Sequence, residues 1–197
     1  VAAERDAVLA IGRPEAGPDA GPDAGPDAVG GVTLSPAAMR SVSLPHDRAS
    51  RRIVLPSPNG STIAALLAES GASVVGASLR NRTAVAGWLR PLVTAGRAVA
   101  LIAAGERWPD GSLRPAVEDL WGAGAVLDAL DPPDLSPEAA VGRDAYRAVA
   151  DLSAALAGCA SGRELVERGY ADDVTVAAEL DVSDVVPILR DGLFTLA

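Results

Sequence analysis

Short apolar runs alternate with polar turns along most of the chain, in the order strand, helix, strand, helix. Apolar runs rich in β-branched residues predict strands over residues 51–55, 73–79 and 98–106, and the last of these, AVALIAAGE, is the strongest candidate for a buried strand. Helical spacing predicts helices over 61–70, 81–96, 116–130, 137–157 and 161–169. Because the loops between these elements are short, we expect an α/β fold with a mainly parallel sheet in three α/β/α layers.

The ends of the chain are less regular. Residues 37–50 predict a short helix and a loop, and the C-terminal run predicts a strand or two because Val174, Val176, Val185 and Val186 favour extended backbone. Residues 16–28 repeat Ala-Gly-Pro-Asp, which defeats both helix and strand and offers nothing large to bury. We therefore expect one domain over 1–197 with a disordered insert at about 14–30.

Composition narrows the range of partners. Hydrophobic residues make up 49% of the chain but aromatic residues only 3%, so the core must consist of Ala, Val and Leu. The net charge of -9 disfavours nucleic acid or an anionic membrane as a partner, since both require clustered cations. No apolar run is long enough to span a membrane, and the first residues do not read as a secretory signal. We expect a soluble cytoplasmic protein.

Two residue types are scarce, and their scarcity restricts the chemistry. With one Cys and one His, the chain cannot form an internal disulfide or a zinc site of the usual Cys/His kind. His46 precedes a strand in a polar segment and is expected to be a solvated loop residue unless it belongs to a Ser-His-Asp triad. Cys159 is expected to be a small buried side chain rather than a nucleophile. Any chemistry therefore falls to carboxylates, arginines and hydroxyls.

The loop SPNGS at 57–61 follows one predicted strand and opens a helix. Asn59 and Gly60 tolerate positive φ, and Ser61 or Thr62 can cap the helix. A strand, a tight turn and a capped helix aim several backbone N–H groups at one point, which is how proteins hold phosphate and other oxyanions. The same local sequence also suits an ordinary α/β connection, so both readings stay open.

A second polar loop, GERWPDGSLR at 105–114, follows the strongest predicted strand. Glu106, Arg107 and Arg114 lie in it, and Glu118 and Asp119 fall in the first turns of the next helix. Carboxylates of this kind suit magnesium, and arginines suit an anionic substrate. The alternative is that the acidic residues only complement the helix dipole. Parallel strands would place both loops at the same edge of the sheet.

Other motifs are excluded or have simpler explanations. Residues 122–124, Gly-Ala-Gly, lie in mid-helix without a third glycine, so close helix–sheet packing is favoured over a dinucleotide site. The chain contains neither Gly-Lys-Ser nor Gly-Lys-Thr, which rules out a Walker loop. The tryptophans are too scattered to stack nucleic-acid bases.

Several segments together resemble the 2-phosphosulfolactate phosphatase family, the ComB-like proteins. The most distinctive is AAGERWPDGSLRPAVEDLWGAGAVLDAL at 103–130, and similar segments lie at 57–62, 73–89 and 161–192. AAERDAVL near the start and GVTLSP at 31–36 also resemble family segments. The resemblance covers nearly the whole chain apart from the Ala-Gly-Pro-Asp repeat.

The resemblance implies a magnesium-dependent acid phosphatase of α/β fold. In methanogens that make coenzyme M, this activity converts 2-phosphosulfolactate to 3-sulfolactate, and members also occur in bacteria without that pathway. It further implies three sets of site residues: a phosphate cradle, acid–base or magnesium-binding carboxylates, and arginines for the anionic substrate. The phosphate cradle comprises Ser57, Asn59, Gly60, Ser61 and Asn81. The carboxylates are Glu106, Glu118 and Asp119, with Glu118 and Asp119 as metal ligands, and the arginines are Arg107 and Arg114.

One departure from the family pattern affects the expected activity. The family's opening strand and turn, which resemble Val-Ile-Asp-Val-Leu-Arg-Ala-Thr, have no counterpart here, so we expect a sheet that is incomplete at the N-terminus. Exposed sheet edges would favour aggregation or a homo-oligomer. We also expect the enzymatic activity of this chain to be poor. The alternative function is a catalytically inactive protein that binds a small anion or a partner chain. Direct attack by water and a covalent intermediate both remain open.

Overall fold

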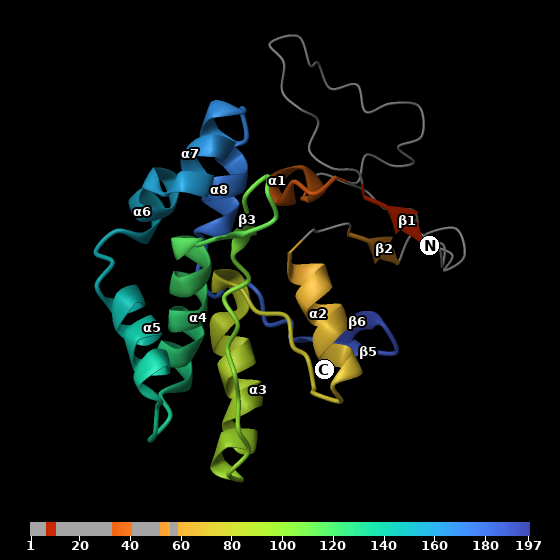
Figure 1. The fold of residues 1–197 in the computed structure, drawn as a ribbon, viewed down its shortest axis with the longest axis vertical. Coiled ribbons are helices and arrows are strands. Elements are labelled where there is room, and N and C mark those ends of the chain that lie inside the picture. The colour runs from red at the N-terminus through yellow and green to blue at the C-terminus, as the bar shows by residue number, and fades with distance from the viewer. Residues whose placement is uncertain (1–6, 11–32, 41–51, 56–58) are drawn as a thin grey trace.

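The fold is dominated by helices (Figure 1). The structure is a computed structural model that describes residues 7–10, 33–40, 52–55 and 59–197. Its helices are α1 (Pro36–Met39), α2 (Gly60–Glu69), the single 3-10 turn η3 (Leu79–Asn81), α3 (Arg82–Thr94), α4 (Val117–Leu130), α5 (Pro137–Arg147), α6 (Leu152–Gly158), α7 (Ala160–Glu167) and α8 (Ala171–Ala177). Its strands are β1 (Val8–Leu9), β2 (Ile53–Val54), β3 (Glu106–Arg107), β4 (Leu113–Arg114), β5 (Pro187–Arg190) and β6 (Leu193–Leu196). No helix in these ranges is long and apolar enough to cross a membrane.

Helix α4 lies at the centre of the packing. On one side, Val126 and Leu130 of α4 pack with Val85 and Leu89 of α3 and with Ile188 of β5. On another side, a second cluster joins α4 to η3, α6 and α8 through Leu79, Ala125, Leu156 and Val174. The side chains of both clusters are aliphatic, as the composition requires. Helices packed around α4 therefore hold the fold together.

The described strands form three separate two-stranded sheets. β1 and β2 pair in parallel, with Val8 opposite Ile53, whereas β3–β4 and β5–β6 are antiparallel hairpins. Asp191 and Gly192 form the tight turn of the second hairpin, and both have positive φ (51° and 74°). The mixture of helices and strands agrees with the α/β class, while a three-layer parallel sheet is not confirmed.

Two predicted strands are largely absent from the described fold, and one predicted strand is a helix. Of residues 98–106 only Glu106 lies in a strand, and Ile102 is 51% exposed. Of residues 73–79 only Val75 makes a bridge, to Ile188. A strand needs a neighbouring strand for its hydrogen bonds, so an apolar run alone does not produce one. The region of Val174 and Val176, expected to be extended, is helix α8, because burial of these valines outweighs their β propensity.

The helix predictions are mostly confirmed, together with their end signals. Gly96 ends the α3 region with φ of 76°, and the Ser136 hydroxyl caps α5 by accepting a bond from the Ala139 N–H at 3.2 Å. The helix predicted over 137–157 is divided because Asp151 caps α6, accepting from the Ala154 N–H at 2.9 Å. The Ala-Gly-Pro-Asp repeat and His46 lie outside the described residues.

The glycines at 122–124 pack differently from the expectation. Gly124 faces α5 rather than a sheet: a Cβ there would overlap the Gly142 carbonyl oxygen and lie 2.8 Å from Cβ of Tyr146. A Cβ at Gly122 would meet open space. The close contact here is therefore between two helices and not between a helix and a sheet as expected. Gly124 makes this contact, and Gly122 does not.

Candidate active site

Most of the expected site residues lie at the start of α2, in the β3–β4 hairpin or at the start of α4. Both helices point their N-terminal ends, and hence the positive ends of their dipoles, toward this region. The hairpin lies between the chain segment 97–105 and α4, and the first turn of α7 borders it through Ser161. Three stretches distant in sequence, the start of α2, residues 97–119 and the start of α7, thus contribute to one region.

The two loops singled out in the sequence are in direct contact. The Asn59 side-chain Nδ2 donates a hydrogen bond to Oε2 of Glu106 at 2.8 Å. Asn59 precedes α2 but makes no capping bond with its side chain, which leaves its amide to orient the Glu106 carboxylate. Gly60 and Ser61 form the first turn of α2 next to this contact. The expectation that Asn59 and Glu106 lie together is therefore met.

Asp119 ties the start of α4 to the end of segment 97–105. Its Oδ2 accepts a hydrogen bond from the Gly105 backbone N–H at 2.8 Å, and Gly105 has φ of 70°. Burial raises the pKa of Asp119; the Gly105 bond opposes this, and the negative charges of Glu118 and Glu106 raise it further. Two other carboxylates thus lie close enough to Asp119 to disfavour its charged form, and a cation nearby would oppose this effect.

Arg114 is held by α7 and by an indole ring. It pairs with Glu106 in the β3–β4 register, while its guanidinium binds both carboxylate oxygens of Glu164 at 2.8 and 3.2 Å. A further bond reaches the Ser161 hydroxyl at 3.1 Å, and the guanidinium lies 5.4 Å from the centre of the Trp108 ring. Arg114 therefore joins the hairpin to α7. Sequence reasoning did not find Glu164 or Ser161 as its partners, because no local signal links residues about fifty positions apart.

Two other expected substrate-binding residues have partners of their own. Arg107 is exposed and donates to the Gly111 carbonyl at 2.8 Å, which closes its own loop. Asn81 is buried; its Nδ2 donates to the Val185 and Gly76 carbonyls, and its Oδ1 accepts from the backbone and hydroxyl of Ser78. The structure does not bring Asn81 to the Asn59–Glu106 contact through any of these bonds. Ser57 lies outside the described residues.

A cavity of about 440 Å³ opens beside Glu118. Its described lining combines segment 97–105, the hairpin, the first turn of α4 and α7, through Ala103, Gly105, Leu113, Pro115, Ala116, Val117, Glu118, Leu120 and Ala160. Cys159 lies next to this wall as the cap of α7. Its pKa is raised by burial, a hydrogen bond from the Gly162 N–H opposes this, and the nearby Glu118 charge raises it further. A thiol that resists ionisation is a poor nucleophile, which agrees with the expected structural role.

Glu118 and Asp119 are the residues whose donor chemistry can be compared with that of magnesium. Among the described residues, no group of three or more His, Cys, Asp or Glu side chains is placed to hold a metal ion. Magnesium, however, is commonly held by one or two carboxylates, with waters and substrate phosphate filling the remaining positions. Burial is the main cause of the raised pKa of Asp119, and the charges of Glu118 and Glu106 add to it, so a cation near Asp119 would be favourable. Glu118 and Asp119 thus match the donor chemistry of magnesium without forming a complete cage.

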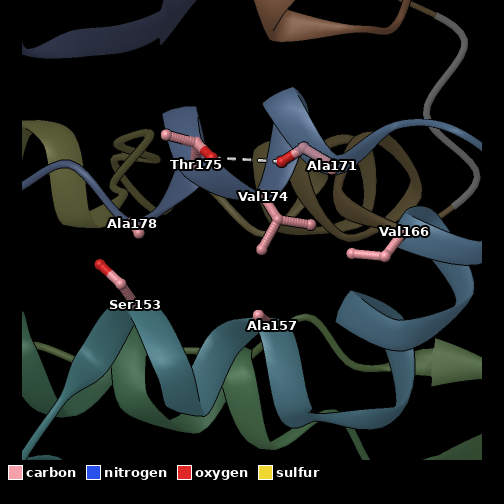
Figure 2. Close-up of a pocket in the computed structure, with 7 residues that line it drawn as sticks. All are labelled: Ser153, Ala157, Val166, Ala171, Val174, Thr175 and Ala178. Atoms are coloured by element: carbon pink, nitrogen blue, oxygen red, sulfur yellow. Dashed lines mark hydrogen bonds between the residues drawn. The ribbon is translucent and has the colours of Figure 1, made fainter.

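A second cavity, of about 200 Å³, lies between helices α6, α7 and α8 (Figure 2). Its lining residues are Ser153, Ala157, Val166, Ala171, Val174, Thr175 and Ala178. The Thr175 hydroxyl donates to the Ala171 carbonyl at 3.3 Å, a bond within the helix. No ionisable side chain is among these lining residues, so this cavity offers no comparable chemistry.

The N-terminus of α2 beside Glu106, with a cavity that includes the neighbouring Gly105, suits a polar small-molecule site. Comparison with known proteins gives the family. A family model described as 2-phosphosulpholactate phosphatase matches residues 32–192, and the chain belongs to that family. The matched range includes both polar loops and the start of α4.

One curated relative is from Deinococcus radiodurans and is named "Probable 2-phosphosulfolactate phosphatase". It is 31% identical to this chain over 147 residues, which is 73% of this chain. The aligned part covers 58% of the relative, so the match leaves a substantial part of that protein without a counterpart.

Proposed function

We propose that this chain is a phosphatase that hydrolyses a small phosphomonoester with the help of magnesium. The reference substrate, carried over from the name of the family, is 2-phosphosulfolactate, which would give 3-sulfolactate and phosphate. The observation that carries the proposal is the 2.8 Å contact between Asn59 and Glu106, because it joins the helix N-terminus expected to cradle phosphate to a carboxylate expected to act on it.

Each residue has a distinct role in this proposal. The first turn of α2, at Gly60 and Ser61, binds the phosphate through backbone N–H groups. Asn59 orients Glu106, which moves the proton of the attacking water or of the leaving group. Glu118 and Asp119 hold magnesium, which when bound neutralises phosphate charge. Arg114, fixed by Glu164, contributes positive charge at the edge of the site.

The test measures phosphate release and metal dependence. Wild-type protein with magnesium should release phosphate from 2-phosphosulfolactate, and removal of the metal by a chelator should abolish release. Glu118→Gln and Asp119→Asn should each lower kcat by about a hundredfold or more, since each removes charge at the reacting centre. The Asp119→Asn side chain retains an oxygen for the Gly105 N–H, so its Tm should stay close to that of the wild type.

Glu138→Gln provides a matched control for the helix-dipole alternative. Glu138 is the acidic residue in the first turn of α5, and it corresponds there to Glu118 in α4. If both acids only complement helix dipoles, both variants should lose similar, small amounts of stability and keep their activity. Loss of activity in Glu118→Gln alone supports the metal-binding role. Binding of the phosphorylated acid without release by the wild type would instead support the alternative, an inactive anion-binding protein.

A further inference from the structure

We propose that Glu164 and Ser161 of α7 are positioning residues, which hold the Arg114 guanidinium in place to bind a second acidic group of the substrate, a sulfonate or a carboxylate. This inference rests on the proposed phosphatase function and deepens it, because it assigns the residues that select a phosphomonoester with further negative charge. It is carried by the contacts that Arg114 makes with α7 and by its place in the hairpin.

The contacts with α7 fix the position of this guanidinium. Nη1 and Nη2 each donate to one carboxylate oxygen of Glu164, at 2.8 and 3.2 Å, and Nη2 also donates to the Ser161 hydroxyl at 3.1 Å. The centre of the Trp108 ring lies 5.4 Å from the guanidinium carbon, and the Arg114 side chain is 15% exposed. Because these contacts order the side chain before a substrate arrives, binding costs less conformational entropy.

The hairpin places Arg114 beside the proposed site. Arg114 and Glu106 are opposite each other in the β3–β4 register, so their side chains leave the same face with Cβ atoms about 4.5–5.5 Å apart. The hydrogen bond with Glu164 raises the pKa of Arg114, burial opposes this, and the Glu164 charge adds to it. The charges of Glu106 and Glu118 raise this pKa further, so the guanidinium lies within electrostatic reach of both carboxylates.

Arg114 keeps hydrogen-bond donors for a ligand. A guanidinium has five N–H groups, and the bonds to Glu164 and Ser161 use three of them. None of the described residues accepts a hydrogen bond from Nε or from the second Nη1 hydrogen. An oxygen of a sulfonate or carboxylate can accept one of these bonds. A second anionic group also needs a cation here, since Glu106 and Glu118 would otherwise repel it.

The experiment compares two secondary phosphomonoesters in the presence of magnesium. 2-Phosphosulfolactate carries acidic groups besides the phosphate, whereas glycerol 2-phosphate carries hydroxyls in their place. The measured quantity is the ratio of kcat/KM for 2-phosphosulfolactate to kcat/KM for glycerol 2-phosphate. We expect a ratio of about ten or more for the wild type, mainly through a lower KM, because the additional acidic groups bind but do not react.

Variants of the three residues should lower this ratio. Glu164→Ala and Arg114→Ala should each lower it about tenfold, and the double variant should lower it no further than Arg114→Ala, because Glu164 acts through Arg114. Glu164→Asp, which keeps a carboxylate, should recover part of the loss. Ser161→Ala removes one neutral hydrogen bond and should lower the ratio by about two- to threefold. Because Glu164 is 47% exposed, its ion pair contributes little stability, and the Tm of Glu164→Ala should stay close to that of the wild type.

Glu167→Ala is the matched control, because Glu167 is an exposed acidic residue of the same helix outside the contacts with Arg114. It should change the ratio by less than about a factor of two. If Glu164 only joins α7 to the hairpin, Glu164→Ala should lower kcat/KM for both substrates equally and leave the ratio unchanged. That result, or a wild type without a preference for 2-phosphosulfolactate, would overturn the inference while phosphatase activity stands.

Binding separates this inference from the proposed function. If neither substrate releases phosphate, the proposed function is wrong, and calorimetry with the same two compounds then tests the inference alone. Tighter binding of 2-phosphosulfolactate that Glu164→Ala weakens about tenfold, and Glu167→Ala does not, supports the positioning role. Equal affinities of the wild type for the two compounds, or binding of neither, overturn it.

Discussion

The contact between α4 and α5 at Gly124 predicts opposite effects for two otherwise similar substitutions. In Gly124→Ala, the new Cβ would lie 2.8 Å from Cβ of Tyr146 and 2.9 Å from the Gly142 carbonyl carbon, and it would also overlap the carbonyl oxygen. A backbone carbonyl cannot rotate away, so the two helices must separate. Overpacking of this kind costs about 1–3 kcal/mol, and we expect the upper end here.

Helix propensity offsets part of that cost. Alanine is better than glycine in a helix by about 1 kcal/mol, so Gly124→Ala should lose a net ~2 kcal/mol of unfolding free energy. For a chain of this size, that corresponds to a Tm lower by about 4–8 °C. Gly122 lies in the same helix, and a Cβ there would meet open space. The unfolding free energy of Gly122→Ala should therefore rise by up to about 1 kcal/mol.

Thermal unfolding followed by far-UV circular dichroism measures both variants against the wild type. The close contact at Gly124 requires that the Tm of Gly124→Ala is lower than that of the wild type and that the Tm of Gly122→Ala is not. Equal shifts for the two substitutions, or a rise in Tm for Gly124→Ala, would show that α4 and α5 do not approach closely at this point.

Further predictions separate catalytic from structural residues. Asn59→Ala should lower kcat by about 10- to 100-fold at unchanged Tm, since it removes one hydrogen bond to the Glu106 carboxylate. Asn81→Ala should instead lower the unfolding free energy by about 1–3 kcal/mol, because it strands buried backbone groups; equal activity losses at unchanged Tm in both variants would contradict this. For Asp181, burial raises the pKa, but hydrogen bonds from Thr83 and Arg82 outweigh it and lower the pKa overall. The stability from Asp181 is therefore present above its unfolded pKa of 3.8 and is lost as the pH falls through the lower folded value. Urea titrations should find Asp181→Asn less stable than the wild type by up to about 1 kcal/mol at pH 7, and this difference should shrink as the pH falls below 3.8.

The helices follow from local sequence, and so does part of the site. Ser136 and Gly96 mark a helix start and a helix end that the structure confirms. The loop before α2 and the loop before α4 were both recognisable as polar connections, and the structure brings them together through Asn59 and Glu106. The inference assumed parallel strands meeting at one sheet edge, whereas β2 and β3 belong to separate sheets, so the contact is as expected but the assumed sheet does not account for it.

The partners of Arg114 could not be inferred in the same way. Glu164 and Ser161 belong to a helix about fifty residues further along, and nothing in their sequence marks them as partners of an arginine in a hairpin. Only the position of α7 beside the hairpin decides that this guanidinium binds Glu164 and Ser161. That α7 holds Arg114 is therefore a tertiary result, and a role of Arg114 in substrate binding stays a prediction.

The sequence by itself determined most of the helices, the aliphatic core and the family, although it missed α8 and the break between α5 and α6. It did so because a helix closes its hydrogen bonds within one segment, so capping residues and spacing are sufficient to define it. The tertiary structure alone decided where extended segments pair, as residues 98–104 show: their apolar run reads as a strand, yet none of them lies in a described strand. A strand takes its hydrogen-bond partners from elsewhere in the chain, and no local pattern specifies where they are.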